Sequence, residues 1–293
     1  MEQFDLFGNP VIKDVLLREK FMEPPFSVLD TKGGDWQNRK RLWKNLGLES
    51  HLGREAKCLP QFGGILDENG LDKYGRKPML ETSVFDPALC ELLYTWYCPE
   101  GGSILDPFAG GSVRGIVANY LGFKYTGIDI RQEQIDSNVE QGKKILAENN
   151  QPTWLVGDSN VVLATLDFEA DLIFSCPPYH DLEVYSDLDG DISNLDYESF
   201  LVIYSQIIKK AVSKLKRGGY AIFVVGDIRD KQGYYKDFLG HTKDAFINAG
   251  AKLYNEAILL QPLGTAMLRA AKVFESGKKL TKVHENILIF KKP

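Results

Sequence analysis

The stretch Ser103-Ile-Leu-Asp-Pro-Phe-Ala-Gly-Gly-Ser112 decides the fold of this chain. Its first residues are apolar and predict a short buried strand that ends at Asp106. Gly110 and Gly111 predict a tight turn, and the amphipathic run 113–121 predicts a helix directly after it. A strand, a glycine turn and a helix form a ligand site at the carboxyl end of a strand in an open α/β sheet. The glycines let a ligand approach the backbone, and the helix start offers unpaired N–H groups.

A second stretch, Asp171-Leu-Ile-Phe-Ser-Cys-Pro-Pro-Tyr179, predicts another buried strand. Its two prolines fix their own backbone angles and predict a rigid turn. Because parallel strands end at one edge of a sheet, this turn places Tyr179 at the same edge as the glycine loop.

Together the two motifs resemble those of the DNA methyltransferases that methylate an exocyclic amino group, N6 of adenine or N4 of cytosine, with S-adenosylmethionine. In that family an Asp-Pro-Phe-x-Gly-x-Gly-like loop binds the methionine end of the cofactor. The matching residues here are Asp106, Pro107, Phe108, Ala109, Gly110, Gly111 and Ser112. A glycine loop alone is weak evidence of such a site, whereas two motifs in this order at strand ends are far more specific.

The family's second motif, (Asp/Asn/Ser)-Pro-Pro-(Tyr/Phe/Trp), holds the target base and is matched by Pro177, Pro178 and Tyr179. Cys176 stands where the family has Asp, Asn or Ser. The resemblance implies that the side chain at position 176 and the carbonyl of Pro177 accept the two N–H bonds of the target amine. Tyr179 would stack on the base, which must leave the duplex to fit. The chemistry requires no metal.

Cys176 leaves alternatives open because sulfur is a weak hydrogen-bond acceptor. Ser175 could substitute for it, and the similar size of serine slightly favours cytosine N4 as the target. Alternatively, Cys176 could attack C6 of a pyrimidine and enable C5 methylation. Enzymes of that kind usually carry Pro before the Cys, where this chain has Ser175.

The next strand ends predict further cofactor contacts. The run 124–129 predicts a strand whose terminal Asp129, followed by Ile130, can accept hydrogen bonds from ribose hydroxyls. The run 154–159 predicts a third strand. In the family that the chain resembles, Asp158, followed by Ser159, would contact the adenine amino group, although it could instead cap a helix.

The segment before the first strand resembles the family motif that closes over the methionine end of the cofactor. Its candidates are Phe85 and Asp86, just ahead of a predicted helix over 88–97. The alternative is an ordinary core helix.

Periodicity predicts further helices over 131–148, 197–216 (stopped by residues 217–219) and 238–249, and strands over 220–225, 253–260 and 286–290. The last two strands could form an antiparallel closing pair. The expected fold is therefore a Rossmann-like class I methyltransferase, with a seven-stranded mostly parallel sheet, an antiparallel closing strand and helices on both faces. Residues 83–293 form the expected catalytic domain. Residues 1–82 form an irregular or helical extension, with an extended segment over 24–30.

Two basic segments are candidates for DNA contact. The first holds Arg39, Lys40, Arg41 and Lys44 beside Trp36 and Trp43, a mixture that suits phosphate contact and base stacking. It could equally be a helix that docks its tryptophans on the core. The second is the insert near 262–284, with Arg269, Lys272, Lys278 and Lys279, which could also be a solvated loop. The acidic stretch 181–198 between them could be a lid or a solvated loop.

Composition bounds these expectations. With 293 residues, 44% hydrophobic and 26% charged, the chain suits a soluble globular protein. The net charge of −5 argues mildly against a nucleic-acid partner but does not exclude one. Four cysteines without metal-ligand spacing favour free thiols in the cytoplasm. No apolar run approaches the ~20 residues of a membrane span, so we expect no membrane partner.

Few residues separate the loop from the turn, and no large recognition domain fits between them. Target recognition must then come from residues 1–85, the insert at 262–284 or a partner. The sequence therefore favours a short or relaxed target site, or a solitary modification methyltransferase such as phages carry. Two other hypotheses remain. One is a methyltransferase of the same fold acting on RNA or a small molecule, which the acidic composition favours. The other is a non-catalytic nucleic-acid-binding relative.

Overall fold

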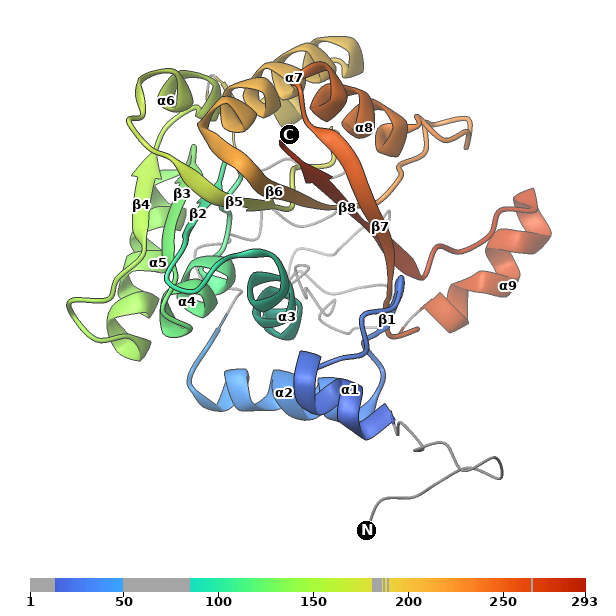
Figure 1. The fold of residues 1–293 in the computed structure, drawn as a ribbon. Helices are drawn as coiled ribbons and strands as arrows, with labels where there is room; N and C mark the ends of the chain where they lie inside the picture. Colours follow the sequence, from blue (N-terminus) through green and yellow to red (C-terminus); the bar gives the residue numbers. More distant parts are fainter. Residues whose placement is uncertain (1–13, 50–84, 181–185, 187, 189, 265) are drawn as a thin grey trace, which may run out of the picture.

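The computed structural model describes residues 14–49, 85–180, 186, 188, 190–264 and 266–293. Its centre is an eight-stranded sheet with the order β1-β7-β8-β6-β5-β2-β3-β4 (Figure 1). All neighbouring strands are parallel except β8, which runs antiparallel to both β6 and β7. The strands are β1 (Val28–Asp30), β2 (Ser103–Asp106), β3 (Lys124–Asp129), β4 (Thr153–Val156), β5 (Ala170–Ser175), β6 (Leu215–Val225), β7 (Lys252–Leu260) and β8 (His284–Lys291).

This strand order confirms the expected Rossmann-like class I methyltransferase fold, with its antiparallel closing strand. The sheet has eight strands rather than seven because β1, in the predicted extended segment, pairs with β7. The switch from β5 to β2 in the middle of the sheet reverses the strand order, and ligands bind at such a point in open α/β sheets.

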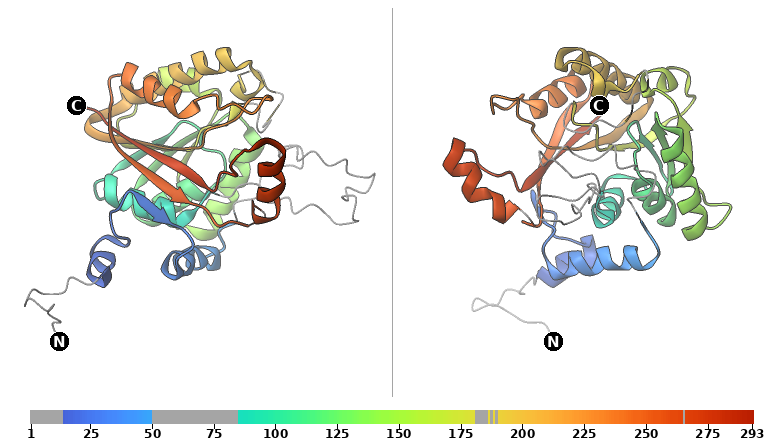
Figure 2. Two further views of the ribbon diagram at one scale, coloured as in Figure 1. Left: turned by 90° about the vertical axis from the view of Figure 1, so that its right-hand side faces the viewer. Right: turned by 180° about the vertical axis from the view of Figure 1, so that it is seen from behind.

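Helices cover both faces of the sheet (Figures 1 and 2). One layer contains α3 (Pro87–Tyr97), α4 (Val113–Tyr120) and α5 (Gln132–Ile145), with α1 (Asp14–Phe21) and α2 (Gly34–Asn45) outside α3. The other layer contains α6 (Ser159–Thr165), α7 (Tyr197–Lys214) and α8 (Phe238–Asn248). Each layer encloses its own apolar core against the sheet. A last helix, α9 (Ala266–Gly277), projects from the body and buries no side chain among the described residues.

The predicted helix over 197–216 is two residues too long, since α7 ends at Lys214 and β6 begins at Leu215. The predicted glycine stop at 217–219 lies inside β6. Leu215 pairs with Ala170 of β5, and Gly218 donates its N–H to the carbonyl of Lys292. These bonds to distant strands extend β6 through residues that favour a turn locally. The helices α6 and α9 are not among those that the sequence predicts.

The described part of the N-terminal extension packs on the rest of the chain. Trp36 and Trp43 of α2 are 2% and 5% exposed and belong to the same apolar core as α3 and α4. This confirms the alternative in which α2 docks its tryptophans on the core, so these rings are not available to stack on bases. Most of the acidic stretch before 190 and the whole of 50–84 lie outside the described residues.

None of the helices in the described ranges has the length and apolarity needed to cross a membrane.

Candidate active site

One cavity of about 970 Å³ opens at the edge of the sheet where the parallel strands end. Both sequence motifs reach it. The predicted site residues that line it are Phe85, Asp86, Pro107, Phe108, Gly110, Gly111, Asp129, Ile130, Asp158, Ser159, Cys176, Pro177, Pro178 and Tyr179. We call the part around residues 106–114 the loop end, and the part around residues 176–179 and 285 the turn end. Of the residues predicted for catalysis or cofactor binding, three do not line the cavity: Asp106, Ala109 and Ser112. Of the cations predicted for DNA contact, Lys40 and Arg269 line it.

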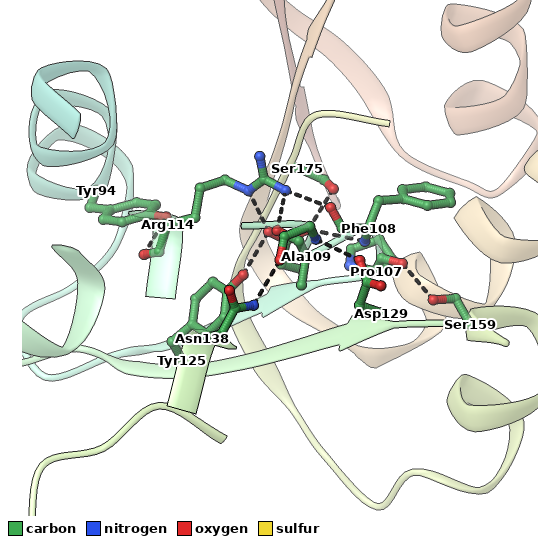
Figure 3. Close-up of polar contacts among 12 residues, drawn as sticks. Tyr94, Pro107, Phe108, Ala109, Arg114, Tyr125, Asp129, Asn138, Ser159 and Ser175 are labelled. Carbon is green, nitrogen blue, oxygen red and sulfur yellow. Dashed lines mark hydrogen bonds and ion pairs between the residues drawn. The ribbon is translucent and has the colours of Figure 1, made fainter. Parts of the chain in front are cut away.

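Asp106 organises the loop end although it does not line the cavity. Figure 3 shows its partners Phe108, Arg114, Tyr125 and Ser175. Its carboxylate is fully buried and accepts four hydrogen bonds. Oδ2 accepts from Arg114 Nε at 2.6 Å and from the Tyr125 hydroxyl at 2.7 Å. Oδ1 accepts from the Ser175 hydroxyl at 2.5 Å and from the Phe108 N–H at 3.0 Å. Asp106, at the end of β2, is therefore bound to the glycine loop, α4, β3 and the end of β5.

Arg114 is the charge that balances Asp106, and sequence reasoning missed it. Its guanidinium also donates to the carbonyls of Phe108 and Ala109, and it lies 4.8 Å from the centre of the Phe85 ring. Burial alone would lower the pKa of Arg114, but the Asp106 carboxylate raises that pKa above its ordinary value. The side chain therefore stays cationic and holds two carbonyls of the loop in place. The only signal for it in the sequence is a cation at the second position of a helix whose next four residues, 115–118, carry no polar side chain.

The glycine loop has a backbone conformation that depends on Gly110, whose φ is +51°. Its N–H donates to Asp129 Oδ2 at 2.9 Å, and its carbonyl accepts from Asn138 Nδ2 at 2.7 Å. Both bonds tie the loop to the following strand and to α5. Gly111 also lines the cavity, so the backbone forms part of the cavity wall as the motif predicts.

Asp129 lies where β3 ends. Oδ2 accepts from Gly110, and Oδ1 accepts from the N–H of Arg131 at 2.9 Å. Burial raises the pKa of Asp129, and the hydrogen bonds from these two N–H groups oppose that rise. Each carboxylate oxygen has a second lone pair, so the side chain can still accept hydrogen bonds from a ligand in the cavity.

Asp158 caps a helix, which was one of the two alternatives, and its predicted contact with the cofactor adenine stays a prediction. Its side chain accepts from the N–H of Asn160 at 2.7 Å and caps α6. It also lines the cavity, beside Gly157 with a φ of +144°. The neighbouring Ser159 is turned inward and donates its hydroxyl hydrogen to the carbonyl of Pro107 (Figure 3).

Phe85 and Asp86 close the cavity from the side of α3. Asp86 caps that helix and accepts from Ala88 at 2.9 Å. Its other oxygen accepts from Trp36 Nε1 and from Lys40 Nζ, both at 3.1 Å. Asp86 therefore anchors α2 of the N-terminal extension beside the cavity.

At the turn end, Cys176 and Tyr179 both line the cavity. Burial raises the pKa of Cys176 to about 12, with a further rise from the Glu285 charge. The hydroxyl of Tyr179 accepts a hydrogen bond from the N–H of Gly226 at 3.0 Å. Its ring packs edge-on against that of Phe238, with 6.1 Å between the ring centroids. The turn therefore presents a protonated thiol and an aromatic ring with a fixed orientation.

The wall beside the turn comes from the ends of β6, β7 and β8, and sequence reasoning missed it. It contributes Asp227, Gln261, Lys282 and Glu285 to the cavity lining. Gln261 Nε2 donates to Glu285 Oε2 at 2.8 Å. Burial lowers the pKa of Lys282, and the charges of Asp227 and Glu285 oppose that fall. No motif marks these residues, although all of them lie close to the ends of predicted strands.

The two basic segments differ in their surroundings. In α2, Arg39 forms an ion pair with Glu91 at 2.8 Å and Lys40 forms one with Asp86, whereas Arg41 and Lys44 are exposed. In the second segment, Arg269 of α9 lines the cavity and Lys272 is exposed. Lys278 lies over the ring of Phe274, and Lys279 is partly buried.

Within the parts of the chain that the structure describes, no group of three or more His, Cys, Asp or Glu side chains could hold a metal ion.

Comparison with known proteins gives partial likenesses. No family model matches the chain. The release factor glutamine methyltransferase of Fusobacterium nucleatum is 33% identical over 137 residues, which are 43% of this chain and 38% of that protein. The chain thus covers well under half of this relative's length.

Two solved structures have folds similar to most of this chain. TrmN from Thermus thermophilus has a TM-score of 0.49 and 15% identity, covering 73% of this chain and 51% of that one. A methyltransferase from Pyrococcus furiosus has a TM-score of 0.48 and 14% identity, covering 87% of this chain and 97% of that one.

Proposed function

We propose that this chain is an S-adenosylmethionine-dependent DNA methyltransferase. It transfers a methyl group to the exocyclic amino group of adenine (N6) or cytosine (N4) in a base flipped out of the duplex. The observation that supports this most strongly is that one cavity combines the glycine loop, the acidic ends of β3 and β4, and the Pro-Pro-Tyr turn. Residues 83–293 would be the catalytic domain.

The residues at the loop end fit the proposed cofactor. Glycines with positive φ at 110 and 157 keep the cavity wall free of side chains where the backbone must approach a ligand. Asp129 would accept from ribose hydroxyls, Asp158 would accept from the adenine amino group, and Phe85 would cover the methionine end. When bound, S-adenosylmethionine supplies a sulfonium methyl group that a nitrogen lone pair can attack.

The turn end fits a planar amine better than a pyrimidine C6. The lone pair of such an amine is delocalised, so the site must hold the nitrogen in line with the methyl group. The Pro177 carbonyl would accept one N–H, and the Tyr179 ring would stack on the base. A thiol whose pKa is raised to about 12 is protonated near neutral pH, and the thiol is a far weaker nucleophile than the thiolate. This disfavours Cys176 as the nucleophile of a C5 methyltransferase.

A DNA backbone would approach from the side of α9. This helix projects beside the cavity, and its Arg269 lines it. Lys272, Lys278 and Lys279 follow Arg269 in the sequence and add further positive charge to this segment. Arg41 and Lys44 of α2 are further candidates for phosphate contact, since cations bind phosphates without regard to sequence.

Nucleoside mass spectrometry tests this proposal. Unmethylated double-stranded DNA is incubated with the protein and methyl-labelled S-adenosylmethionine, then digested to nucleosides. We expect label in N6-methyladenine or N4-methylcytosine, and none with the Tyr179→Ala variant. Label on C5 of cytosine would make Cys176 the nucleophile. Absence of label from DNA, while the cofactor binds, would overturn the proposal in favour of RNA, a small molecule or a non-catalytic binding role.

A protein substrate is a second candidate because the curated relative is a glutamine methyltransferase. The side chain of glutamine ends in a carboxamide, whose NH2 nitrogen is planar and conjugated like that of a base. The same turn could hold either group. A reaction that offers DNA and a purified bacterial release factor together separates the two, since the label enters one of them.

A further inference from the structure

The turn end contains a carboxyl group that neither sequence motif includes. Glu285 lies near the start of β8, paired with Leu259 of β7. Its neighbour Asn286 pairs with Val225, the last residue of β6. Because β8 runs antiparallel, its beginning lies at the edge where the parallel strands end. Glu285 therefore lines the same cavity as Cys176.

Two neighbours hold the Glu285 carboxyl group in position. Gln261 donates to Oε2 at 2.8 Å, and the side chain of Tyr179 forms a second hydrogen bond to the carboxyl group. The Tyr179 hydroxyl is itself fixed by the N–H of Gly226. A carboxylate offers about four lone-pair sites, so these two donors leave acceptor sites for a group in the cavity.

Glu285 and Cys176, which line the same cavity, also interact electrostatically. Burial raises the pKa of Glu285, while Gln261 and the charge of Lys282 oppose the rise. After burial, the charge of Glu285 is the largest contribution that raises the pKa of Cys176. The carboxyl group and the thiol both line the cavity, and the polar neighbours of Glu285 include Gln261, Lys282 and Tyr179.

The proposed reaction needs an oxygen acceptor that Cys176 does not supply. A planar amine presents two N–H bonds, and the Pro177 carbonyl can accept one of them. A thiol is a weak acceptor, so the second N–H would be left without a strong partner in a partly buried site.

We propose that Glu285 supplies this missing acceptor, taking the role that the side chain at position 176 plays in the family that the chain resembles. The inference rests on the proposed function and adds a catalytic residue to it. Formation of the nitrogen–carbon bond breaks the carbon–sulfur bond of the methyl donor, whose electron pair stays on sulfur. The nitrogen must then lose one proton. Glu285 accepts this proton on its carboxylate and returns it to solvent.

Steady-state kinetics of Glu285→Gln on the DNA substrate test the proposal. We expect kcat to fall by about 10²-fold or more, the range for loss of a general acid–base group. The pH profile of kcat/KM should also lose its acidic limb, which a purely structural role would not cause. S-adenosylhomocysteine affinity, measured by calorimetry, should be unchanged because the residues that fit the cofactor lie at the loop end.

A second variant provides a rescue test. Cys176→Asp places a carboxylate where the family has one. The double variant E285Q/C176D should therefore have a kcat at least about tenfold higher than E285Q alone. Glu256→Gln is the matched control, since Glu256 forms an ion pair with Lys243 outside the cavity. If E285Q unfolds, Glu285→Asp, which withdraws the carboxyl group by one methylene, must show the same kinetic loss.

The outcomes separate this inference from the proposed function. A wild-type enzyme that labels neither DNA base overturns both. A wild-type enzyme that labels DNA, with E285Q equally active or with the acidic limb retained, overturns only the role of Glu285. Loss of S-adenosylhomocysteine binding in E285Q would also overturn it, because the defect would then lie in the cofactor site.

Discussion

The two ends of the cavity differ in how their ionisable groups are paired. At the loop end, the Asp106 carboxylate and the Arg114 guanidinium are buried together at 2.6 Å, and neither oxygen of Asp106 faces the cavity without a partner. At the turn end, Glu285 and Cys176 line the cavity, and among the residues that the structure describes neither belongs to a buried ion pair of this kind. Burial raises both pKa values.

This difference separates groups that shape the site from groups that can react in it. A saturated, buried ion pair resists any change of protonation and fixes the backbone around it. A carboxyl group with a raised pKa and spare lone pairs can gain or lose a proton at moderate pH, a property typical of groups used in catalysis. The loop end is therefore the rigid half of the site, and the turn end is the half suited to chemistry.

The largest expected effect comes from breaking the loop end. Asp106→Ala leaves the Arg114 charge buried and unpaired, which should lower the free energy of unfolding by about 3–5 kcal/mol. Urea denaturation measures this. Lys216→Met breaks the ion pair with Asp171, in which Lys216 is 43% exposed, and should cost about 0–1 kcal/mol. Equal losses in the two variants would show that Asp106 is not the organiser of the loop end.

A smaller effect is expected from crowding the same network. A methyl group at Gly127 would lie 2.6 Å from Cε1 of Tyr125 and 2.9 Å from Cβ of Ala109. Gly127→Ala should therefore displace the Tyr125 hydroxyl from Asp106 and destabilise the fold by about 1–3 kcal/mol. The midpoint temperature of thermal unfolding and the affinity for the cofactor should decrease together.

Gly34→Ala is the control for this change, because no atom lies within 4 Å of the added methyl group. It should leave stability unchanged or raise it by up to about 1 kcal/mol. If G127A were as stable as G34A, the tight packing of Tyr125 against the loop would have no energetic role.

The loop end was largely predictable from sequence because local signals define it. A strand, two glycines and a helix follow one another, and the acids at 129 and 158 directly follow apolar runs. What sequence could not give is the orientation of Asp106. Its partners are Phe108, Arg114, Tyr125 and Ser175, which come together only when β2, β3 and β5 pair. A residue in a cofactor-binding motif thus proves not to line the cavity.

The turn end was predictable only in part. The Pro-Pro-Tyr motif marked one wall, but Gln261 and Glu285 lie at the ends of the last two strands, where no local pattern distinguishes a functional carboxylate from a solvated one. Likewise, a mixture of cations and tryptophans in α2 could not reveal that Trp36 and Trp43 are buried. That outcome depends on the acceptors Asp86 and Glu91, which α3 and its cap supply.

The turn end should have a smaller effect on stability than the loop end, and this effect should depend on pH. The pKa of Glu285 is raised above its ordinary value of 4.5 in the folded protein. The folded state therefore binds more protons than the unfolded state, and the stability contributed by Glu285 below pH 4.5 is lost as the pH rises through the raised pKa.

Glu285→Gln removes this loss, so its free energy of unfolding relative to wild type should rise as the pH increases through that window. Urea titrations at several pH values measure it, with Glu256→Gln as the control for the same chemical change outside the cavity. A difference between E285Q and wild type that falls with rising pH would mean that the pKa of Glu285 is lowered, not raised.

The smallest effect on stability is expected from the exposed cations near the turn end. Lys272→Ala with Lys278→Ala should change the free energy of unfolding by no more than about 0.5 kcal/mol, as is usual for surface positions. DNA affinity should nevertheless fall, and the slope of log affinity against log salt should decrease by about 0.9 for each phosphate that the variant no longer neutralises. Fluorescence anisotropy with a labelled duplex measures both quantities.

The matched pair on α2, Arg41→Ala with Lys44→Ala, should reduce the salt slope less. The reason is that α9 begins beside Gln261, which is bound to Glu285 of the turn end, whereas α2 reaches the cavity at Lys40, beside Asp86 and away from the turn. A larger decrease from the α2 pair would move the proposed DNA path to the loop end. The rigid half of the site would then hold both the cofactor and the nucleic-acid backbone, with the turn end receiving only the flipped base.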